Sequence, residues 1–352
     1  MSQVRLQMEL KHKKPPYRLP TMKEVEEIPP NGLKAASLFS GAGGSSLGYK
    51  MDGWQVVWAN EFVSAAAETY KANHPKTFLN VSDIRDLDPD EVLKEAKVAE
   101  GDLDLLDGSP PCASFSVAGN QNESWGKDKK YSDITQKTDD LFLEFARMLK
   151  GMKPRVFVAE NVPGLIQGKA KGYFLAILQR LKDSGYAVKC RVLDAKWLGV
   201  PQSRQRTIFV GVRDDLEVEP SHPRPLPYSY TVREALPWII DARQTQVFKE
   251  KDRIFTDKSC PTVTTMGIGA KRINFVSVKA AKEQTHEANT VQHSKSRKFT
   301  IPELKRLCGF PEDFILTGPY AQQWERLGRA VPPPMMYRIA KEVRGILEKL
   351  KA

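Results

Sequence analysis

Cys112 is the residue of this 352-residue sequence with the clearest capacity for covalent chemistry. Two prolines precede it and restrict its backbone, and the strand-like run 103–106 ends just upstream. The residues around it are polar and include Asp107, Ser109, Ser114 and Ser116. A cysteine held in such a setting at the end of a strand favours a reactive thiolate, which is a good nucleophile. The alternative is a small buried apolar residue, as most free cysteines are.

Two pairs of polar residues farther along the chain have the chemistry to assist a nucleophile. Glu160 and Asn161 follow the apolar run 156–159, and surroundings of that kind can keep a carboxyl group protonated, ready to donate its proton. Arg204 and Arg206 alternate, so an extended segment would present both guanidinium groups on one side, to bind a phosphate or a carbonyl oxygen. Taken singly, Glu160 fits a helix-capping or loop acid equally well, and the arginines fit an exposed basic strand end.

A glycine-rich turn, Phe39-Ser40-Gly41-Ala42-Gly43-Gly44, lies between an apolar run and helix-like sequence. Glycines there let the backbone approach a ligand, and the following helix offers free N–H groups. Glu61 comes about 20 residues later, where a carboxylate can accept hydrogen bonds from a ribose diol, and Asp83 is placed to contact an adenine ring. The turn alone would equally suit another nucleotide or no ligand, and the lysine motif of P-loops is absent from the sequence.

These residues need elements that bring them together, and the chain alternates between strand-like and helix-like segments. Strands are predicted at 35–39, 55–59, 103–106, 156–159 and 207–212, and helices at 45–51, 64–72, 140–150 and 174–182. This alternation predicts an α/β fold with a doubly wound, mixed but mostly parallel sheet. Each polar cluster follows the carboxyl end of a strand, which is the edge where open α/β sheets bind ligands.

The overall composition excludes several classes of protein. Hydrophobic residues make up 41% and charged residues 28%, as in soluble globular proteins, and no apolar run approaches the ~20 residues needed to cross a bilayer. The N-terminus lacks the pattern of a secretory signal, and the four cysteines are too widely spaced to suggest a disulfide framework. A reducing cytoplasm is the expected compartment.

Basic charge is concentrated in one part of the chain. The net charge is +11, and segment 241–300 holds twelve Lys and Arg against six Asp and Glu. Such a segment attracts a phosphate backbone, although the solvated face of an ordinary basic protein fits equally well. We predict a flexible extension at 1–32, a catalytic and cofactor-binding domain at 33–213, a smaller irregular domain at 214–314, and a C-terminal segment at 315–352 that returns to the first domain and contains an amphipathic helix at 335–350.

Ten short motifs occur between about residues 33 and 343, in the order LFSGAGG, NEF, SDI, SPPCASFS, DLFLEFARMLK, AENV, VPQSRQR, PTVTT, RKFTIPELKRLCGFPEDF and GRAVPP. In this order they resemble the cytosine-5 DNA methyltransferase family, most closely its bacterial and phage members. The resemblance implies the Rossmann-like fold of class I S-adenosylmethionine-dependent methyltransferases. It also implies that the domain at 214–314 is a target-recognition domain.

The resemblance implies a chemical role for the polar residues. Cys112 would add to C6 of cytosine and so give C5 the electron density to accept a methyl group from S-adenosylmethionine. Glu160 would donate to N3, and Asn161 would orient the base. Arg206, with Arg204 nearby, would stabilise O2 or a flanking phosphate. The target base would have to be flipped out of double-stranded DNA to reach these groups.

The same resemblance supplies two larger sets of residues. The cofactor site would be lined by Phe39, Gly41, Ala42, Gly44, Glu61, Phe62, Asp83, Ile84, Pro111, Leu141, Arg329 and Val331. Contacts with DNA are expected from Gln202, Lys271, Arg272, Lys295, Arg297 and Lys298. We expect no metal site and a monomer located in the cytoplasm with the nucleoid. A cognate restriction endonuclease would be a functional rather than a physical partner.

Two positions depart from the family pattern. Arg329 stands where the family usually has an asparagine after a glycine, which leaves its role open. Ala113 replaces a glutamine whose side chain would reach into the DNA, and Gln121 or Asn122 are the candidates to replace it. Neither change touches the covalent chemistry.

Three rival functions use the same features differently. A transfer-RNA methyltransferase shares the scaffold and has a Cys-Phe-Thr signature. The most similar segment of this sequence is Cys308-Gly309-Phe310, which does not match it. A DNA-binding regulator without turnover would not need Cys112, Glu160 and Arg206 intact. A nicotinamide dehydrogenase would explain the glycine-rich turn and Glu61, but not the Pro-Pro-Cys segment or the Arg-x-Arg pair.

Overall fold

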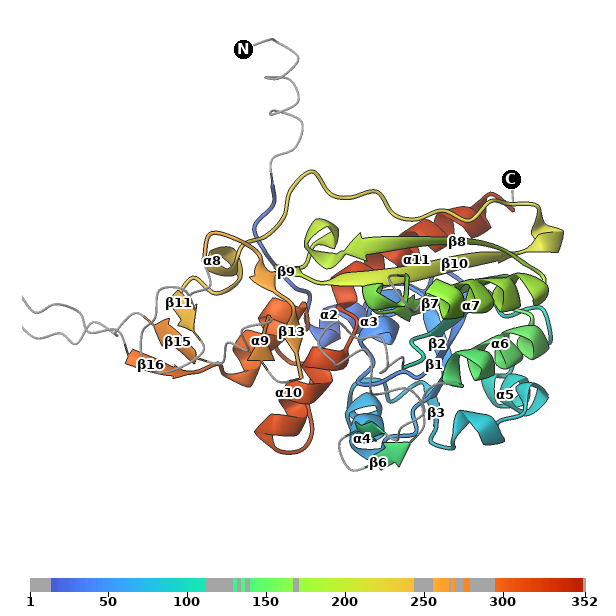
Figure 1. Cartoon of the computed structure of the whole chain (residues 1–352), viewed down its shortest axis with the longest axis horizontal. Coiled ribbons are helices and arrows are strands. Elements are labelled where there is room, and N and C mark those ends of the chain that lie inside the picture. Colours follow the sequence, from blue (N-terminus) through green and yellow to red (C-terminus); the bar gives the residue numbers. More distant parts are fainter. Residues whose placement is uncertain are drawn as a thin grey trace, which may run out of the picture.

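The computed structural model describes residues 14–111, 129–131, 134–136, 140–166, 171–243, 256–265, 267–269, 275–278 and 295–350. Cys112, Ala113, Gln121, Asn122, Lys271 and Arg272 lie outside the described residues, so the roles predicted for them stay predictions. Figure 1 shows a large α/β region on the right and a second region of short strands and helices on the left. The second region comprises the described residues between 229 and 330.

A seven-stranded sheet forms the centre of the large region. Its strands run in the order β3-β2-β1-β4-β7-β10-β8, with the first five parallel and β10 antiparallel to both β7 and β8. Their bounds are β1 Lys34–Leu38, β2 Gln55–Asn60, β3 Phe78–Asn80, β4 Leu105–Gly108, β7 Val156–Asn161, β8 Tyr186–Asp194 and β10 Gln205–Arg213. The chain order reverses between β1 and β4, the position at which such sheets bind ligands. The predicted doubly wound, mixed sheet is confirmed.

The central strands continue one to two residues past their apolar runs and include the polar residues predicted to follow them. β4 ends with Asp107 and Gly108, and β7 ends with Glu160 and Asn161. All six residues of β7 are buried. A buried backbone needs its ladder of hydrogen bonds completed, so the pairing persists where the side chains turn polar.

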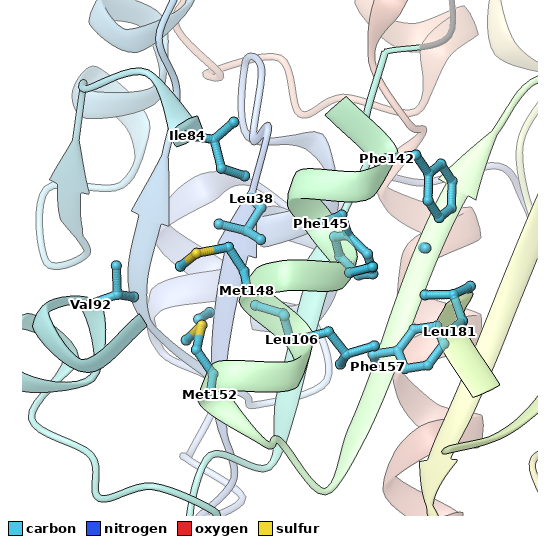
Figure 2. Packing of buried hydrophobic residues seen from close by; sticks show 14 of the residues in the cluster. Leu38, Ile84, Val92, Leu106, Phe142, Phe145, Met148, Met152, Phe157 and Leu181 are labelled. Atoms are coloured by element: carbon cyan, nitrogen blue, oxygen red, sulfur yellow. The ribbon is translucent and has the colours of Figure 1, made fainter. Parts of the chain in front are cut away.

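Side chains of the central strands alternate between two buried faces. Val156 and Val158 of β7 pack in one apolar cluster, and Phe157 and Ala159 pack in the other. Burial on both faces explains the nearly continuous apolar run that the sequence shows here. Figure 2 shows the second of these clusters, with Phe142, Phe145, Met148 and Met152 of one helix against Leu38, Leu106 and Phe157 of the strands.

Helices cover both faces of the sheet. On the face of Val156 and Val158 lie α3 (Gly44–Lys50) and α11 (Pro333–Glu348), where the amphipathic helix was expected. They pack closely because Gly48 has no side chain: a Cβ at that position would lie 2.5 Å from Cβ of Met336. The opposite face carries α5 (Pro89–Ala96), α6 (Leu141–Met152) and α7 (Lys171–Asp183), while α4 (Ser64–Asn73) links β2 to β3.

The second region is built from short pieces. β11 (Ile239–Arg243), β15 (Phe275–Val278) and β16 (Lys295–Lys298) form an antiparallel sheet, and β13 (Val263–Thr264) pairs with β14 (Gly267–Ile268). β12 (Cys260–Pro261) pairs with β9 (Gln202–Ser203), which precedes β10. The helices of the second region are α8 (Val232–Ala235), α9 (Ile301–Cys308) and α10 (Tyr320–Arg329). A separate short hairpin joins β5 (Lys129–Tyr131) to β6 (Ile134–Gln136).

Residues 14–32, here called the N-terminal arm, follow a fixed course over the molecule. The arm contains α2 (Met22–Glu26), which begins at Thr21 with a complete capping box. Val25 is buried in a core cluster that also contains Leu47 of α3 and Leu304 of α9. Residues 14–32 thus pack against the rest of the protein, and the flexibility predicted for residues 1–32 stays a prediction. The single apolar residues of this polar segment show no periodicity in the sequence, yet Tyr17, Met22 and Val25 pack in a cluster formed with other parts of the chain.

Among the helices of the described residues, none is long and apolar enough to cross a membrane.

Candidate active site

One cavity of about 1260 Å³ joins the carboxyl edge of the sheet to the second region. Its walls include all twelve residues predicted for the cofactor site and four of the five predicted catalytic residues. The four are Glu160, Asn161, Arg204 and Arg206, and the fifth, Cys112, follows the lining residue Pro111 in the sequence. The second region contributes Ser259, Pro261, Thr262, Val263, Thr264, Thr265, Gly269, Glu325, Arg326, Gly328, Arg329 and Ala330.

The glycine-rich turn follows β1 and carries a buried carboxylate beside it. The backbone N–H of Gly41 donates to Glu61 Oε2 at 2.7 Å, and that of Val63 donates to Oε1 at 2.8 Å. Burial raises the pKa of Glu61, and the two backbone donors oppose that shift. Gly41 has a φ of 56° and nothing within 4 Å of the place where a Cβ would stand. The cavity therefore reaches the backbone at this point, as a ligand-binding turn requires.

A histidine that was not predicted from the sequence supports this turn from behind. His74 is fully buried, and its Nε2 lies 3.2 Å from the carbonyl oxygen of Gly43. Its Nδ1 lies 3.0 Å from Lys50 Nζ, which can only donate, so Nε2 carries the proton that Gly43 accepts. A Cβ at Gly43 would lie 2.3 Å from that Nε2. The glycine is thus required for close approach of the ring as well as for its φ of 87°.

Arg85 joins the two loops that carry Asp83 and Leu141. Its Nη1 lies 2.9 Å from Asp83 Oδ2, and its Nη2 lies 2.7 Å from Asp140 Oδ1. Ile84 and Leu141, which flank this bridge, are buried apolar residues of the cavity wall. The sequence singled out Asp83 but missed Arg85, because Asp140 is 55 residues away in the chain.

The far end of the cavity is built on β7 and β10. Glu160 and Arg206 are both largely buried, and Arg206 Nε lies 2.6 Å from Glu160 Oε1. Burial lowers the pKa of Arg206, and the Glu160 carboxylate opposes that shift. Asn161 Nδ2 donates to the carbonyl oxygen of Pro110 at 3.1 Å. This amide therefore fixes the proline segment that leads to Cys112.

The profile of the C-5 cytosine-specific DNA methylase family matches residues 33–267 and 246–345 of the chain. The chain belongs to this family. It is 29% identical over 353 residues to the Type II methyltransferase M.NgoPII of Neisseria gonorrhoeae, covering 91% of this chain and 97% of that protein. It is 31% identical over 343 residues to the Type II methyltransferase M.Bsp6I of Bacillus sp. strain RFL6, covering 88% and 98%. The solved S. pombe Dnmt2 methyltransferase shares the fold, with a TM-score of 0.61, 18% identity and 91% and 99% coverage.

The protein is therefore a DNA (cytosine-5-)-methyltransferase, and its fold is that of the S-adenosylmethionine-dependent enzymes. Its two arginines on the β9–β10 segment have separate partners. Arg204 is fully buried and donates from Nη1 to the carbonyl oxygen of Val263 at 3.0 Å and from Nη2 to that of Gly328 at 2.9 Å. Burial and the nearby charge of Arg206 lower the pKa of Arg204 to about 9. Within the described residues, its Nε has no acceptor.

Gln202, predicted to contact DNA, is instead an interior residue of the methyltransferase. Its side chain is fully buried, donates to the carbonyl oxygen of Leu307 at 3.2 Å, and accepts from the backbone N–H of Val263 at 3.0 Å. Both ends of the amide join the large region to the second region, and a contact between Gln202 and DNA stays a prediction. The exposed context suggested by neighbouring arginines was misleading.

The other predicted DNA contacts differ in their surroundings. Arg297 Nη2 lies 2.6 Å from Oε1 of the buried Glu303, whereas Lys298 is exposed. Lys295 lies in β16, where only its backbone is described. Arg329, the departure from the family pattern, lines the cavity and lies 2.8 Å from Glu325 Oε1.

Asp107 lies behind the cavity, and the sequence had suggested only a polar setting for it. It is fully buried and accepts hydrogen bonds from Ser37 Oγ at 3.0 Å and from the Tyr49 hydroxyl at 3.1 Å. Burial raises its pKa to about 7, and the charge of Glu160 adds to the shift. Its carboxyl group links β1, α3 and β4 just below the binding edge.

Proposed function

We propose that this methyltransferase uses S-adenosylmethionine to methylate C5 of a cytosine flipped out of a specific double-stranded DNA sequence, with Cys112 as nucleophile. The observation that carries the proposal is the shared cavity. It holds the glycine-rich turn and Glu61, the Glu160–Arg206 pair, and Pro111, the residue before Cys112. A cofactor and a base bound there would share one enclosed space, as transfer of a methyl group requires.

The residues around the glycine-rich turn fit the cofactor. Glu61 accepts one backbone N–H on each carboxylate oxygen, which leaves lone pairs for a ribose diol. Phe39, Ile84 and Leu141 offer an apolar surface for an adenine ring. S-adenosylmethionine would supply an electrophilic methyl group here. Glu61 would bind its ribose, and Gly41, which has no side chain, would let it approach the backbone.

The chain's own residues would carry the remaining steps. The Cys112 thiolate adds to C6, and the electron density it brings makes C5 nucleophilic, while Glu160 donates a proton to N3. After C5 takes the methyl group, it loses its proton to a base and the bond between sulfur and C6 breaks, which restores Cys112. N3 then returns its proton to Glu160. Asn161 holds the Pro110 carbonyl and so positions the segment that bears the cysteine.

Two arginines would compensate the charge that develops on the base. Arg206 is held by Glu160 at the cavity wall, and its guanidinium group would contact O2. The buried Nε of Arg204 has no acceptor among the described residues, and leaving a buried donor unsatisfied is costly. A carbonyl oxygen of the base or a flanking phosphate would supply that acceptor.

The decisive experiment compares the wild-type enzyme with Cys112→Ala and with Cys190→Ala as a matched control. Cys190 is a half-buried cysteine of β8 whose pKa is raised by burial. Plasmid DNA from cells that express the enzyme is first sequenced after bisulfite treatment, which gives the target sequence. Transfer of tritiated methyl groups to that duplex should fall by about 10⁴-fold in Cys112→Ala and stay near wild type in Cys190→Ala.

A duplex with 5-fluorocytosine at the target should also trap a complex that survives denaturation, because fluorine cannot leave as a proton does. Near-normal transfer by Cys112→Ala, or no trapped complex with the wild-type enzyme, would contradict the covalent mechanism. Methylation of transfer RNA in preference to DNA, or DNA binding without turnover, would contradict the proposed substrate or activity. A restriction endonuclease that cleaves the same sequence is the functional partner we propose.

A further inference from the structure

The N-terminal arm precedes the part of the chain that matches the methylase family, which begins at residue 33. We propose that the arm sets the orientation of the second region over the cavity and thereby the affinity of the enzyme for DNA. The proposal rests on the proposed function in taking DNA as the substrate. None of the arm residues lines the cavity, so a role in binding the cofactor directly is not part of it.

The C-terminal end of the arm is fixed to the large region. The backbone N–H of Asn31 donates to the carbonyl oxygen of Gly53 at 2.9 Å, and its side-chain amide donates to that of Asp52 at 2.8 Å. Gly53 has a φ of 82°, and a Cβ there would lie 2.7 Å from the carbonyl oxygen of Pro29. This end therefore sits tightly on the turn between α3 and β2.

The middle of the arm lies where the two regions meet. The backbone N–H of Met22 lies 2.9 and 3.0 Å from the two carboxylate oxygens of Asp313, just beyond α9. Val25 is buried in the cluster that also takes Leu47 from α3 and Leu307 from α9. This cluster therefore brings buried side chains of the arm, the large region and the second region together.

The N-terminal end of the arm is fixed to the second region. The Tyr17 hydroxyl donates to the carbonyl oxygen of Arg306 at 2.6 Å, and its ring centroid lies 4.9 Å from that of Tyr230. The Tyr230 hydroxyl donates in return to the carbonyl oxygen of Pro15 at 3.1 Å. Lys14 Nζ lies 2.7 Å from the carbonyl oxygen of Ser229 and 2.6 Å from a carboxylate oxygen of Glu234.

The arm thus joins the large region to both α8 and α9 by a route separate from the peptide connections. One wall of the cavity belongs to the sheet and the other, around Thr262 and Thr264, to the second region. If the second region were loosened, part of the free energy of DNA binding would be used to order that region. The affinity for DNA would therefore fall. Glu61 and the glycine-rich turn belong to the sheet side, and of the twelve predicted cofactor residues only Arg329 belongs to the second region, so cofactor affinity would change much less.

The test compares the full chain with a deletion of residues 1–20, which removes Lys14 and Tyr17. A deletion of residues 1–13 keeps both and is the matched control. The larger deletion should raise KM for the mapped DNA duplex about tenfold, change kcat by less than about threefold, and leave S-adenosylmethionine affinity by calorimetry within about twofold. The control should match the full chain. Tyr17→Phe, which loses only the hydroxyl, should raise the DNA KM about twofold to threefold.

Hydrogen exchange gives a second reading that does not depend on activity. The larger deletion should speed amide exchange in α8 and α9 and leave β1 and β4 unchanged. If it does not fold, the double variant Lys14→Ala, Tyr17→Ala replaces it. An unchanged DNA KM, or equal losses of DNA and cofactor affinity, would overturn the proposal. A wild-type enzyme that methylates no DNA would sink the proposed function, while the exchange experiment would still report whether the arm holds the second region.

Discussion

The two walls of the cavity are held in place by different physics. The sheet wall is fixed by continuous burial: all six residues of β7 are buried, and its side chains alternate into two apolar clusters. The wall from the second region is joined to the large region by a shared apolar cluster that includes Leu47 and Val263, and by polar contacts over long chain separations, such as those of Arg204 to Val263 and Gly328. The sheet wall is therefore rigid before any ligand binds. The other wall can change its angle at the cost of those hydrogen bonds and of part of that cluster, a smaller loss than breaking the central sheet.

This contrast assigns chemistry to the sheet wall, and the largest effect is expected there. Glu160→Gln keeps the size of the side chain but removes the acid. Methyl transfer should fall by about 10² to 10⁴-fold, because the N3 proton donor is lost while the cavity keeps its shape. Single-turnover rates at saturating DNA and cofactor would measure it. Glu219→Gln, an exposed carboxylate paired with Lys189, serves as the control and should act like wild type.

The junction between the walls should give the next effect. Arg204→Lys keeps the positive charge but cannot reach the carbonyl oxygens of Val263 and Gly328 with the same forked geometry. We expect about 10 to 100-fold lower kcat/KM for DNA and a smaller change in cofactor affinity. Arg344→Lys, at the Asp52 contact away from the cavity, is the matched control. Equal losses of kcat/KM in Arg204→Lys and Arg344→Lys would contradict a special role for the junction between the walls.

Behind the sheet wall, Asp107 gives a smaller effect that depends on pH. Its pKa is raised from 3.8 to about 7, so between these values the folded protein keeps a proton that the unfolded chain releases. The wild-type free energy of unfolding should therefore fall relative to that of Asp107→Asn as the pH rises from 5 to 7, by about 1.4 kcal/mol per pH unit. Urea denaturation at several pH values would show it. Asp183→Asn, which changes an exposed carboxylate, is the control. If the difference in free energy of unfolding between the wild type and Asp107→Asn were independent of pH and equal to that of the control, the prediction would be contradicted.

The smallest effect is expected on the second region. Lys298 is exposed, and replacing it by Ala should reduce the slope of log affinity against log salt by about one if it meets a phosphate. Arg297 is held by Glu303, and its replacement should lower the stability of α9 more than it changes that slope. Fluorescence anisotropy with a labelled duplex at several salt concentrations separates the two. An unchanged slope for Lys298→Ala would take that residue out of the interface.

The sheet and its binding edge could be predicted because local sequence carries their signal. Burial on both faces makes apolar runs at 156–159 and 207–212, and a glycine-rich turn followed by Glu61 marks the end of the cavity where we propose that the cofactor binds. The bounds were less certain, since β4 and β7 continue through Asp107 and Glu160. A polar residue ends an apolar run in the sequence, although it does not end the hydrogen-bonded ladder of a central strand.

The contacts of the second region gave no such signal. Gln202 and Arg204 lie among polar residues, and their partners are 59 to 124 residues away in the chain. The N-terminal arm has isolated apolar residues, of which Tyr17 and Val25 are used by distant elements. Burial of such residues depends on which surfaces pack together, and the neighbouring residues in the sequence do not indicate this.

The sequence by itself determined the α/β alternation, the placement of polar residues at strand ends, and the motifs that brought Glu61, Glu160 and Arg206 under consideration. The tertiary structure alone decided that Glu160 and Arg206 form a pair, that Gln202 is interior, and that the N-terminal arm contacts both the large region and the second region. The physical reason is the range of the interactions. Apolar periodicity acts over a few residues, whereas the partner of a buried polar group is set by the packing of the whole chain.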